Sequence, residues 1–409
     1  MASAQGTDVY YKKTIPFNFS KQRLQFRVSQ DLFSSHDIDV GTRFLLRTLV
    51  TSEEIGAPAA ILDLGCGYGP IGLTLKRLHP GAVVHLTDRD ALAVEYARQN
   101  AVLNGIEDGV EIYGSLGYDD LRREAFDLIV SNIPGKAGRP VIVELLLGTA
   151  HHLARGGTVA VVVMSPLEPL VADVLGGRSD VVITLHERRS GHTVFHYRFT
   201  EGVTEATDAR SALERGVYCR QTAAVTKADL SYDIETAFNL PEFESPSYAT
   251  ELLFDGLREL RGTEVGRAVQ FNPGQGHAAV ALWRWLEPRH LLLVDRDLLA
   301  LRYARLNLVR NGCPEDRLAL LHQAGIALPH PEPVDLTAGV LREDEGQAAA
   351  ILTLRQAAAQ LAPGGTALIA GGSTAITRLA TFLDAEPLFE VVDRKRRTGH
   401  SLLSLRKPA

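Results

Sequence analysis

The 409-residue chain has no apolar run long enough to cross a membrane, and stretches such as "TVAVVVM" at 158–164 fall far short of the roughly 20 residues required. Its first residues contain no apolar core of a secretory signal, so we expect neither a membrane segment nor export. Cysteines are few: Cys66, Cys219 and Cys313 are an odd number and lie too far apart for local metal-ligand spacing. These absences predict a reducing, cytoplasmic location.

Metal-binding patterns and a strong positive charge are also missing. His151 and His152 point about 100° apart on an expected helix, and no carboxylate follows at ligand spacing, so we expect no metal. The formal net charge of −6 argues against an unselective nucleic-acid binder. Residues 10–47 nevertheless carry seven basic and three acidic side chains among several aromatics. This is typical of a single-stranded RNA surface and also of a half-buried hairpin, which we favour.

What the sequence does contain is a repeat. "TDRDALAVEYARQNAVLNG" matches "VDRDLLALRYARLNLVRNG", and "SGHTVFHYRF" matches "TGHSLLSLRK", at nearly constant offsets of 207 and 208 residues. The register is kept across further blocks, so we predict two copies of one domain. The expected domains are residues 1–205, with an N-terminal β-rich extension, and residues 206–409.

Each copy alternates short apolar runs with segments of helical period. In the first copy we expect strands at 60–64, 83–87, 126–131 and 158–164, and a helix at 91–104. This order predicts an α/β, Rossmann-like fold: a parallel sheet with helices on both faces. "TVFHYRF" alternates after a turn, as an added antiparallel edge strand would.

The stretch "ILDLGCGYGPIG" at 61–72 follows the first strand directly and places glycines at the carboxyl edge of the sheet, where such folds bind ligands. "GYGPIG" satisfies the G-x-G-x-x-G pattern, which is weak evidence alone. Asp88, 21 residues beyond Gly67 at the end of the second strand, strengthens it, because a carboxylate there can accept hydrogen bonds from both ribose hydroxyls of an adenosine.

NAD and S-adenosylmethionine both contain that ribose. Asp63, inside "DLGCG", would repel a pyrophosphate but tolerates a cationic aminoacyl sulfonium. The fourth strand ends in "SNIPG", which places Asn132 and Pro134 over the same crevice. We therefore predict S-adenosylmethionine as the cofactor.

Four segments carry a family resemblance: "FSSHDIDVGTRFLL", "ILDLGCGYGPIGLTL", "FDLIVSNIPGKAG" and "GHTVFHYRF". They resemble the small-domain class I methyltransferases, in particular the two-domain ribosomal RNA guanine-N2 methyltransferases. The resemblance implies an N-methyltransferase of a guanine exocyclic amine, with ribosomal RNA or a ribosomal subunit as partner. The cofactor residues expected are Asp63, Gly65, Cys66, Gly67, Gly69, Asp88, Arg89, Ser115, Asn132 and Thr42.

The catalytic loop is expected at residues 132–134. The Asn132 side chain and the Ile133 carbonyl would hold the target amine, and Pro134 would shape the loop. The family reads Asn-Pro-Pro-aromatic here, so Ile133 replaces a proline and Gly135 replaces the aromatic on which the base would stack. Phe33 is our candidate for the missing ring, unless it is simply a core residue. We count Phe33, Gly135 and Lys136 as candidate substrate contacts.

The second copy has lost these features, although in the family the intact half is the second one. It has "VQFNPGQGHAA", in which we place Asn272 at the position of Asp63 and His277 at that of Pro70. Asp295 matches Asp88, so residual nucleoside binding stays open, but we expect no transfer. The copy would dock substrate or give structural support.

Two further functions stay open. The cofactor could serve methylation of a protein side chain or small molecule, or the chain could bind cofactor without turnover. We expect no membrane partner and a monomer with two pseudo-symmetric domains.

Overall fold

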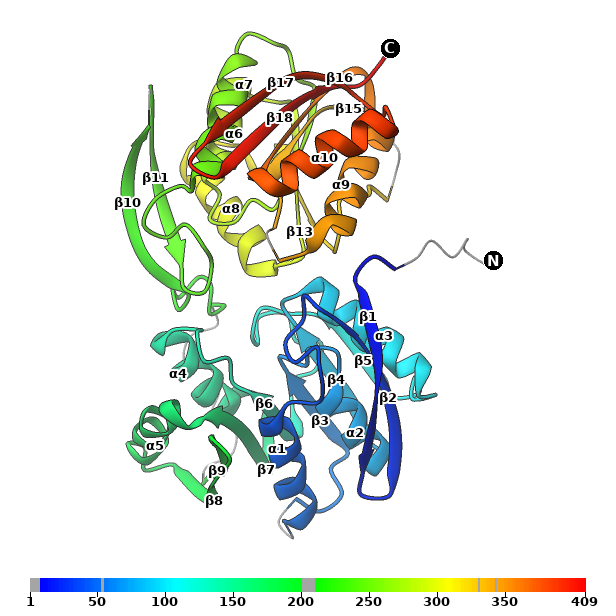
Figure 1. Cartoon of the computed structure of the whole chain (residues 1–409). Helices are drawn as coiled ribbons and strands as arrows, with labels where there is room; N and C mark the ends of the chain where they lie inside the picture. The colour runs from blue at the N-terminus through cyan, green and yellow to red at the C-terminus, as the bar shows by residue number, and fades with distance from the viewer. Residues whose placement is uncertain (1–7, 53–54, 201–209, 228, 330–331, 343) are drawn as a thin grey trace. The chain divides into compact units, whose positions relative to one another are not determined.

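The computed structural model describes residues 8–52, 55–200, 210–227, 229–329, 332–342 and 344–409. The chain divides into two compact units, one of Tyr11–Tyr218 and one that includes Cys219–Ala409 (Figure 1). The boundary expected after residue 205 lies outside the described residues. The Ala212 N–H donates to Asp119 Oδ1 over 2.7 Å, which ties the residues just before Tyr218 to the first unit. No helix in the described part of the chain has the length and apolarity that a membrane crossing needs.

A seven-stranded sheet of order β5-β4-β3-β6-β7-β9-β8 forms the centre of the first unit. Neighbouring strands are parallel from β5 to β7, and β9 is antiparallel to both β7 and β8, so the predicted fold class is confirmed. The expected antiparallel strand is β9, which lies one position inside the edge because β8 pairs with its outer side. The strands are β3 (Ala60–Leu64), β4 (Val83–Asp88), β5 (Val110–Gly114), β6 (Phe126–Asn132), β7 (Leu153–Met164), β8 (Val181–Arg189) and β9 (His192–Phe199).

Helices cover both faces of this sheet, with α1, α2 and α3 on one face and α4 and α5 on the other (Figure 1). All five residues of β3 are buried, as expected for a central parallel strand. The Asp90 side chain caps α3 by accepting from the Leu92 N–H over 2.9 Å. The helices are α1 (Val40–Thr51), α2 (Pro70–Leu78), α3 (Ala91–Leu103), α4 (Arg139–Leu147) and α5 (Glu168–Gly176), with short 3₁₀ turns at Gly148–His151 and Ser165–Leu167.

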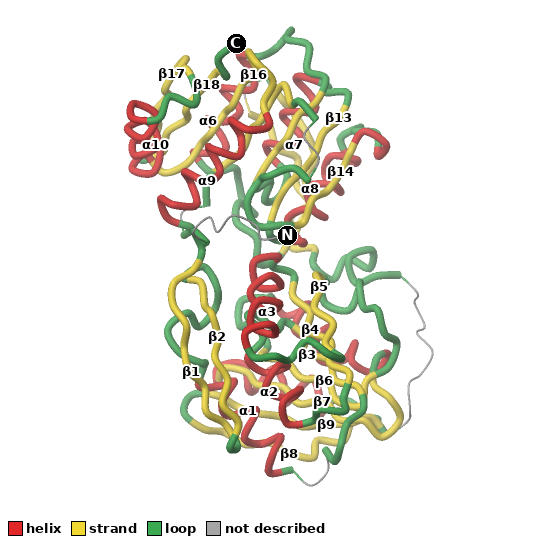
Figure 2. The backbone as a smooth tube through the Cα atoms, turned by 90° about the vertical axis from the view of Figure 1, so that its right-hand side faces the viewer, coloured by secondary structure: helices red, strands yellow, loops and turns green. Residues whose placement is uncertain are grey.

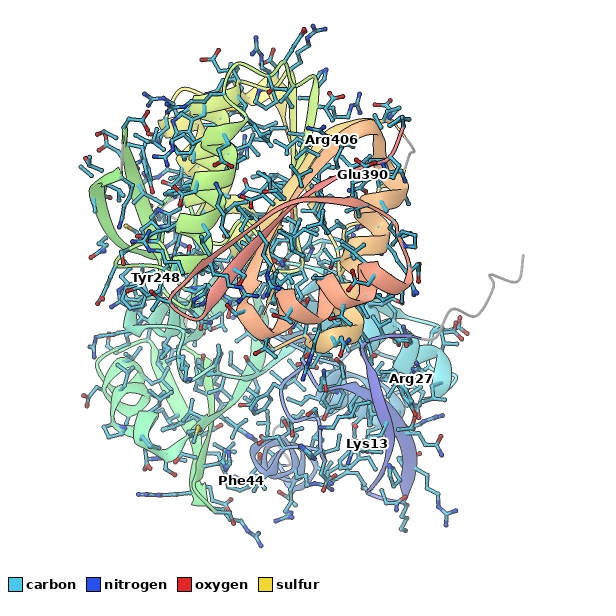
Figure 3. All side chains as sticks on the ribbon, turned by 45° about the horizontal axis from the view of Figure 1, so that its top comes forward. Lys13, Arg27, Phe44, Tyr248, Glu390 and Arg406 are labelled. Carbon is cyan, nitrogen blue, oxygen red and sulfur yellow. The ribbon has the colours of Figure 1, made fainter. Side chains whose placement is uncertain are left out.

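The N-terminal strands β1 (Tyr11–Phe19) and β2 (Gln22–Ser29) form an antiparallel hairpin that lies against α2 and α3 (Figure 2). Its inner face buries Phe17 and Phe26. Lys13 and Arg27 belong to its two strands (Figure 3), and the Arg27 guanidinium lies 4.3 Å from the centre of the Tyr11 ring. The favoured hairpin is therefore present, and its central aromatics pack inward while its basic side chains lie on the partly exposed face.

The second unit repeats this plan, with the sheet order β14-β13-β12-β15-β16-β18-β17 and a separate hairpin. Its strands are β10 (Cys219–Lys227), β11 (Leu230–Ala237), β12 (Arg267–Phe271), β13 (His290–Asp295), β14 (Leu318–His322), β15 (Val334–Val340), β16 (Leu361–Gly372), β17 (Glu390–Arg397) and β18 (His400–Arg406). Its helices are α6 (Tyr248–Glu259), α7 (His277–Leu286), α8 (Leu298–Arg310), α9 (Gly346–Gln360) and α10 (Ser373–Ala385), with a 3₁₀ turn at Glu315–Arg317.

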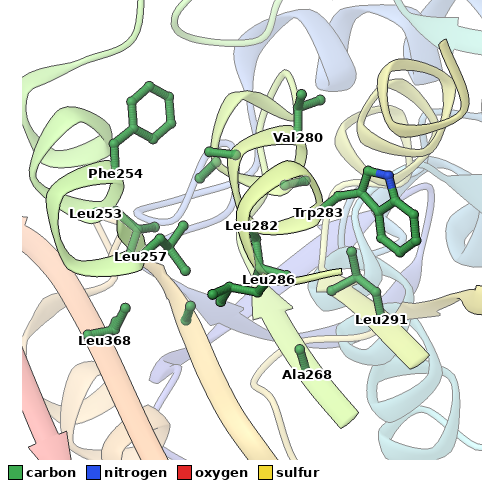
Figure 4. Packing of buried hydrophobic residues seen from close by; sticks show 14 of the residues in the cluster. Leu253, Phe254, Leu257, Ala268, Val280, Leu282, Trp283, Leu286, Leu291 and Leu368 are labelled. Atoms are coloured by element: carbon green, nitrogen blue, oxygen red, sulfur yellow. The ribbon is translucent and has the colours of Figure 1, made fainter. Parts of the chain in front are cut away.

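Two apolar layers stabilise the second unit, one on each face of the sheet. Ala268 packs in the layer formed with α6, α7 and α8, while its neighbour Val269 packs with α9 and α10. Figure 4 shows Leu253 and Leu257 of α6 on the side of that helix that faces Leu286 of α7. Strand alternation thus divides the side chains between two cores.

Candidate active site

The glycine turn joins β3 to α2 and uses its glycines in two ways. Gly65, Gly67 and Gly69 have φ of 74°, 55° and 92°, a region that favours glycine. A Cβ on Gly65 or Gly67 would meet no atom within 4 Å beyond its chain neighbours, so the backbone there is open to a ligand. A Cβ on Gly72 would collide with Leu86 at 2.7 Å. Gly65 and Gly67 therefore leave room for a ligand, whereas Gly72 permits close packing against Leu86.

Asp88 lies at the carboxyl end of β4 and faces this turn. Its Oδ2 accepts from the Gly67 N–H and its Oδ1 from the Asp90 N–H, both over 2.9 Å. Burial, and then the neighbouring charge of Asp90, raise the pKa of Asp88 to about 6, although the two N–H donors oppose the shift. Asp88 as a whole is half-buried, and each carboxylate oxygen accepts one backbone hydrogen bond, so lone pairs are left for hydroxyl donors.

Asp63 lies beneath the same turn and has no exposed surface. Its Oδ2 accepts from the Gly72 N–H over 2.7 Å, while its Oδ1 has no hydrogen-bond partner among the described residues. Burial raises the pKa of Asp63 to about 7. Its observed contact is with the turn itself, and direct contact with a cofactor stays a prediction. When ionised, its unpaired oxygen favours a cation above the turn over a pyrophosphate.

Asn132, the last residue of β6, contacts two residues that belong to the start of α1. Its Nδ2 donates to Asp39 Oδ2 over 3.1 Å and to Thr42 Oγ1 over 3.3 Å. Asp39 also caps α1 by accepting from the Thr42 N–H over 3.0 Å. The structure therefore unites the predicted Thr42 and Asn132, which are 90 residues apart in sequence.

The residues after Asn132 form an open rim. Ile133 is buried, whereas Pro134, Gly135 and Lys136 are exposed. A Cβ on Gly135 would meet only Leu167, at 3.9 Å, so the position lost from the family pattern leaves free space.

Phe33 is 72% exposed, which excludes the core alternative. It lies in the loop between β2 and α1. The Tyr68 hydroxyl donates to the Ser34 carbonyl over 3.3 Å and so connects this loop to the glycine turn.

The other predicted cofactor residues lie around the turn with unequal access. Cys66 is buried, and burial raises the pKa of its thiol, so we expect an unreactive small side chain. Ser115 is buried beside β4, where its N–H donates to the Asp88 carbonyl over 3.0 Å. Arg89 follows Asp88 and is half-buried. Of these three, Arg89 is the most accessible to a ligand.

Asn100 on α3 is a residue that our sequence reasoning missed. Its Nδ2 donates to the Tyr68 carbonyl over 2.9 Å and its Oδ1 accepts from the Arg27 N–H over 2.7 Å, so it joins hairpin, helix and glycine turn. In the second unit Asn307 joins the corresponding hairpin, helix and turn. The signal was available, because this asparagine is identical in the two repeats.

Backbone hydrogen bonds fix how the two units correspond. The Gly65 N–H donates over 2.8 Å to the carbonyl of the penultimate residue of β4. The Asn272 N–H donates over 2.9 Å to the carbonyl of the penultimate residue of β13. Asn272 therefore stands at the position of Gly65 and also has a positive φ, 47°. Our placement of Asn272 at the Asp63 position is wrong, and Gln270 stands there. His277 begins its helix as Pro70 does, as expected.

An arginine fills the equivalent crevice of the second unit. The N–H groups of Ile133 and Leu341 make equivalent bonds to β7 and β16, so Val340 stands at the position of Asn132 and Arg342 at that of Pro134. The Arg342 guanidinium donates to Asp295 Oδ1, and its Nε lies 3.4 Å from Asn272 Oδ1. The carboxylate expected to bind a nucleoside is already paired within the chain.

Comparisons with known proteins agree with this architecture. The family model described as methyltransferase small domain matches residues 23–182. The chain is 33% identical over 153 residues to uncharacterized protein YbxB of Bacillus subtilis, covering 37% of this chain and 74% of that one. It is 35% identical over 138 residues to ribosomal RNA small subunit methyltransferase C of Haemophilus influenzae, covering 33% of this chain. It is 38% identical over 152 residues to ribosomal RNA small subunit methyltransferase C of Pseudomonas entomophila, covering 36% of this chain.

The alignments span only 40% and 43% of those two methyltransferases. A solved structure from T. thermophilus, the 16S rRNA guanine N2 methyltransferase RsmC in complex with AdoMet and guanosine, covers 97% of this chain and 99% of its own. Its TM-score is 0.66 at 18% identity, so the likeness is one of fold.

Proposed function

Because this chain belongs to the methyltransferase small-domain family, we propose that it transfers a methyl group from S-adenosylmethionine to the exocyclic amine of a guanine in small-subunit ribosomal RNA. The observation that carries the proposal is the fixed amide of Asn132 at the same sheet edge as Asp88 and the open glycines. Relatives with methyltransferase C names, and the two-unit neighbour solved with AdoMet and guanosine, support the substrate. This substrate would place the enzyme in the cytoplasm.

The residues of the first unit fit the cofactor. The open backbone at Gly65 and Gly67 admits an adenosine, Asp88 can accept from ribose hydroxyls, and the buried charge of Asp63 suits a cation. When bound, S-adenosylmethionine supplies a methyl group that is already activated on a sulfonium. The protein then has to hold and orient the nucleophile.

The target amine is held by acceptors at the end of β6. The guanine amine is a poor nucleophile because its lone pair is delocalised into the ring. Hydrogen bonds to Asn132 Oδ1 and the Ile133 carbonyl would orient the amine and favour its pyramidal form. We assign base stacking to the exposed ring of Phe33, in the loop that the Tyr68 hydroxyl connects to the glycine turn, because Gly135 supplies no ring.

We assign the second domain, which the sequence predicts as residues 206–409, a non-catalytic role in docking or support. Val340 cannot accept a hydrogen bond at the position of Asn132, and Arg342 pairs with the carboxylate that a ribose would need. We therefore expect calorimetry to show one adenosylhomocysteine bound per chain. Light scattering should show a monomeric protein. Two equivalent sites would contradict this assignment.

The test is transfer from tritium-labelled S-adenosylmethionine into separated RNA, protein and metabolite fractions, followed by nucleoside analysis of the RNA. Ribosomal RNA should take up label as N2-methylguanosine. Label in protein or metabolites would select the second enzyme class that the sequence leaves open. Cofactor binding without transfer to any fraction would indicate a binding protein.

The matched variants separate the two halves of the site. Asn132→Ala should abolish transfer and leave the affinity for adenosylhomocysteine within about twofold, because Asp88 and the glycine turn supply most of the cofactor contacts in this scheme. Asp88→Ala should remove cofactor binding itself. Loss of cofactor binding in Asn132→Ala would mean that Asn132 is misplaced in this scheme.

A further inference from the structure

The contact between Asp39 and Asn132 does more than cap a helix. Asp39 Oδ2 accepts two hydrogen bonds, from the Thr42 N–H over 3.0 Å and from Asn132 Nδ2 over 3.1 Å. A carboxylate can only accept, so it requires the NH₂ end of the Asn132 amide to face it. The Oδ1 of Asn132 must then point the other way, and it has no hydrogen-bond partner among the described residues.

The second unit shows that helix capping alone does not need this carboxylate. Ser247 stands at the position of Asp39, and its Oγ accepts from the Thr250 N–H over 3.2 Å, so α6 is capped as α1 is. In that unit Val340 stands where Asn132 stands, and there is no amide to orient. The carboxylate is therefore present in the unit that has the amide and absent from the unit that lacks it.

Gly41 leaves the space that the Asp39 carboxylate occupies. A Cβ on Gly41 would lie 2.6 Å from the His192 ring and 2.9 Å from Asp39 Oδ2. A larger residue at position 41 would therefore displace the carboxylate or the His192 ring, and glycine leaves Asp39 the space in which it reaches Asn132.

We propose that Asp39 is a positioning residue, which holds the Asn132 amide with its carbonyl oxygen towards the target amine. The inference rests on the proposed function, because it names the group that prepares the same site. An amide turned by 180° would present its NH₂ group to an amine and could accept no hydrogen bond from it. Without Asp39 both orientations become accessible, so the rate of transfer falls while cofactor binding is preserved.

The first test compares Asp39→Ser, which copies the cap of the second unit, with wild type. We expect kcat to fall about 10- to 100-fold, with unchanged adenosylhomocysteine affinity and melting temperature. Asp39→Ala should lose the cap as well and melt lower. The control is Asp37→Ser, which removes an exposed carboxylate of the same loop that pairs with Arg43 and should keep wild-type kcat. Wild-type kcat in Asp39→Ser would overturn the proposal.

The second test exchanges the two groups. Asn132→Asp should be nearly inactive, because two carboxylates would face each other. The double variant Asp39→Asn with Asn132→Asp restores a donor opposite an acceptor and should regain at least about tenfold over Asn132→Asp. Equal activity of the single and the double variant would contradict the proposal.

A third readout needs no activity. In nitrogen-labelled wild type, the side-chain amide protons of Asn132 should be shifted and protected by their bond to Asp39, and Asp39→Ser should remove both effects. If the wild-type chain methylates no RNA but these effects are seen, the proposed function fails and the Asp39 contact stands. Unprotected amide protons in an active wild-type enzyme would remove the contact alone.

Discussion

Asp63 and Asp88 are two carboxylates held at the ends of neighbouring strands, both with a raised pKa. Burial raises the pKa of Asp63 from an ordinary 3.8 to about 7, so between these values the folded protein binds a proton that the unfolded chain releases. Stability from this residue is therefore full at low pH and is lost as the pH rises through about 7.

We predict that Asp63→Asn becomes more stable than wild type as the pH rises. The asparagine can still accept from the Gly72 N–H but carries no buried charge. The difference in free energy of unfolding should be near zero at pH 4 and grow to about 4 kcal/mol above pH 7. Denaturant unfolding followed by circular dichroism measures it, and a difference that does not change with pH would contradict the assignment.

For Asp88 we predict a pH-dependent cofactor affinity. Ribose hydroxyls bind the ionised carboxylate, and the pKa of Asp88 is about 6 in the free protein. Adenosylhomocysteine should therefore bind about tenfold more weakly for each pH unit below 6. Calorimetry between pH 5 and 8 tests this, with Asp88→Asn as the control: it should bind weakly at every pH.

At the residue scale, sequence reasoning found the side chains that come after strands, because the carboxyl ends of parallel strands converge. Asp88 and Asn132 are of this kind. It did not find the burial of Asp63 or the displacement of Asn272, since a two-residue shift within a glycine turn changes partners without changing composition. It also left the partner of Asn132 undetermined, because Asp39 approaches only through the packing of α1.

Among the elements, the loop between β2 and α1 carries the exposed Phe33, and the loop after β6 lacks an aromatic at Gly135. We predict that Phe33→Ala weakens RNA binding by about 1–3 kcal/mol and leaves adenosylhomocysteine affinity unchanged. Gly135→Tyr should fold normally, because its Cβ has room and its φ is not in the left-handed region, and should recover binding in the Phe33→Ala background. Filter binding at fixed salt measures both, and unchanged binding in Phe33→Ala would remove the stacking role.

Element prediction succeeded where burial made the pattern strong. β3 spans the expected 60–64, and α3 ends one residue before the expected limit. β8 was not predicted, because its residues are largely exposed at the sheet edge, and so the antiparallel strand was expected at the edge itself. β5 was also missed, because it is short and only partly buried.

For the whole molecule, the two units can be followed separately. Both tryptophans, Trp283 and Trp285, belong to the second unit, whereas circular dichroism reports on both units. We predict that adenosylhomocysteine raises the melting temperature of the transition that is invisible to tryptophan fluorescence, because a ligand stabilises only the unit that binds it. A shift of the tryptophan transition by the same amount would indicate that the units unfold together or that both bind.

The ion pair of Arg342 with Asp295 should contribute strongly to the second unit. Asp295 is 2% exposed, so Arg342→Ala leaves a buried carboxylate unpaired, and we expect a loss of about 3–5 kcal/mol in the tryptophan-reported transition. Arg289→Ala is the matched control, because its pair with Glu264 is exposed, and it should cost at most about 1 kcal/mol. Equal effects of the two variants would show that the filled crevice contributes no stability.

The Arg342 guanidinium in the second unit also means that the two units differ in whether they depend on a supplied ligand. A pocket that carries its own counter-ion is complete as soon as the chain has folded, whether or not any nucleoside is present. We expect the first unit, with its open turn, to gain stability when the cell supplies a ligand. Starvation for methionine would thus soften one half of the protein and leave the other unchanged.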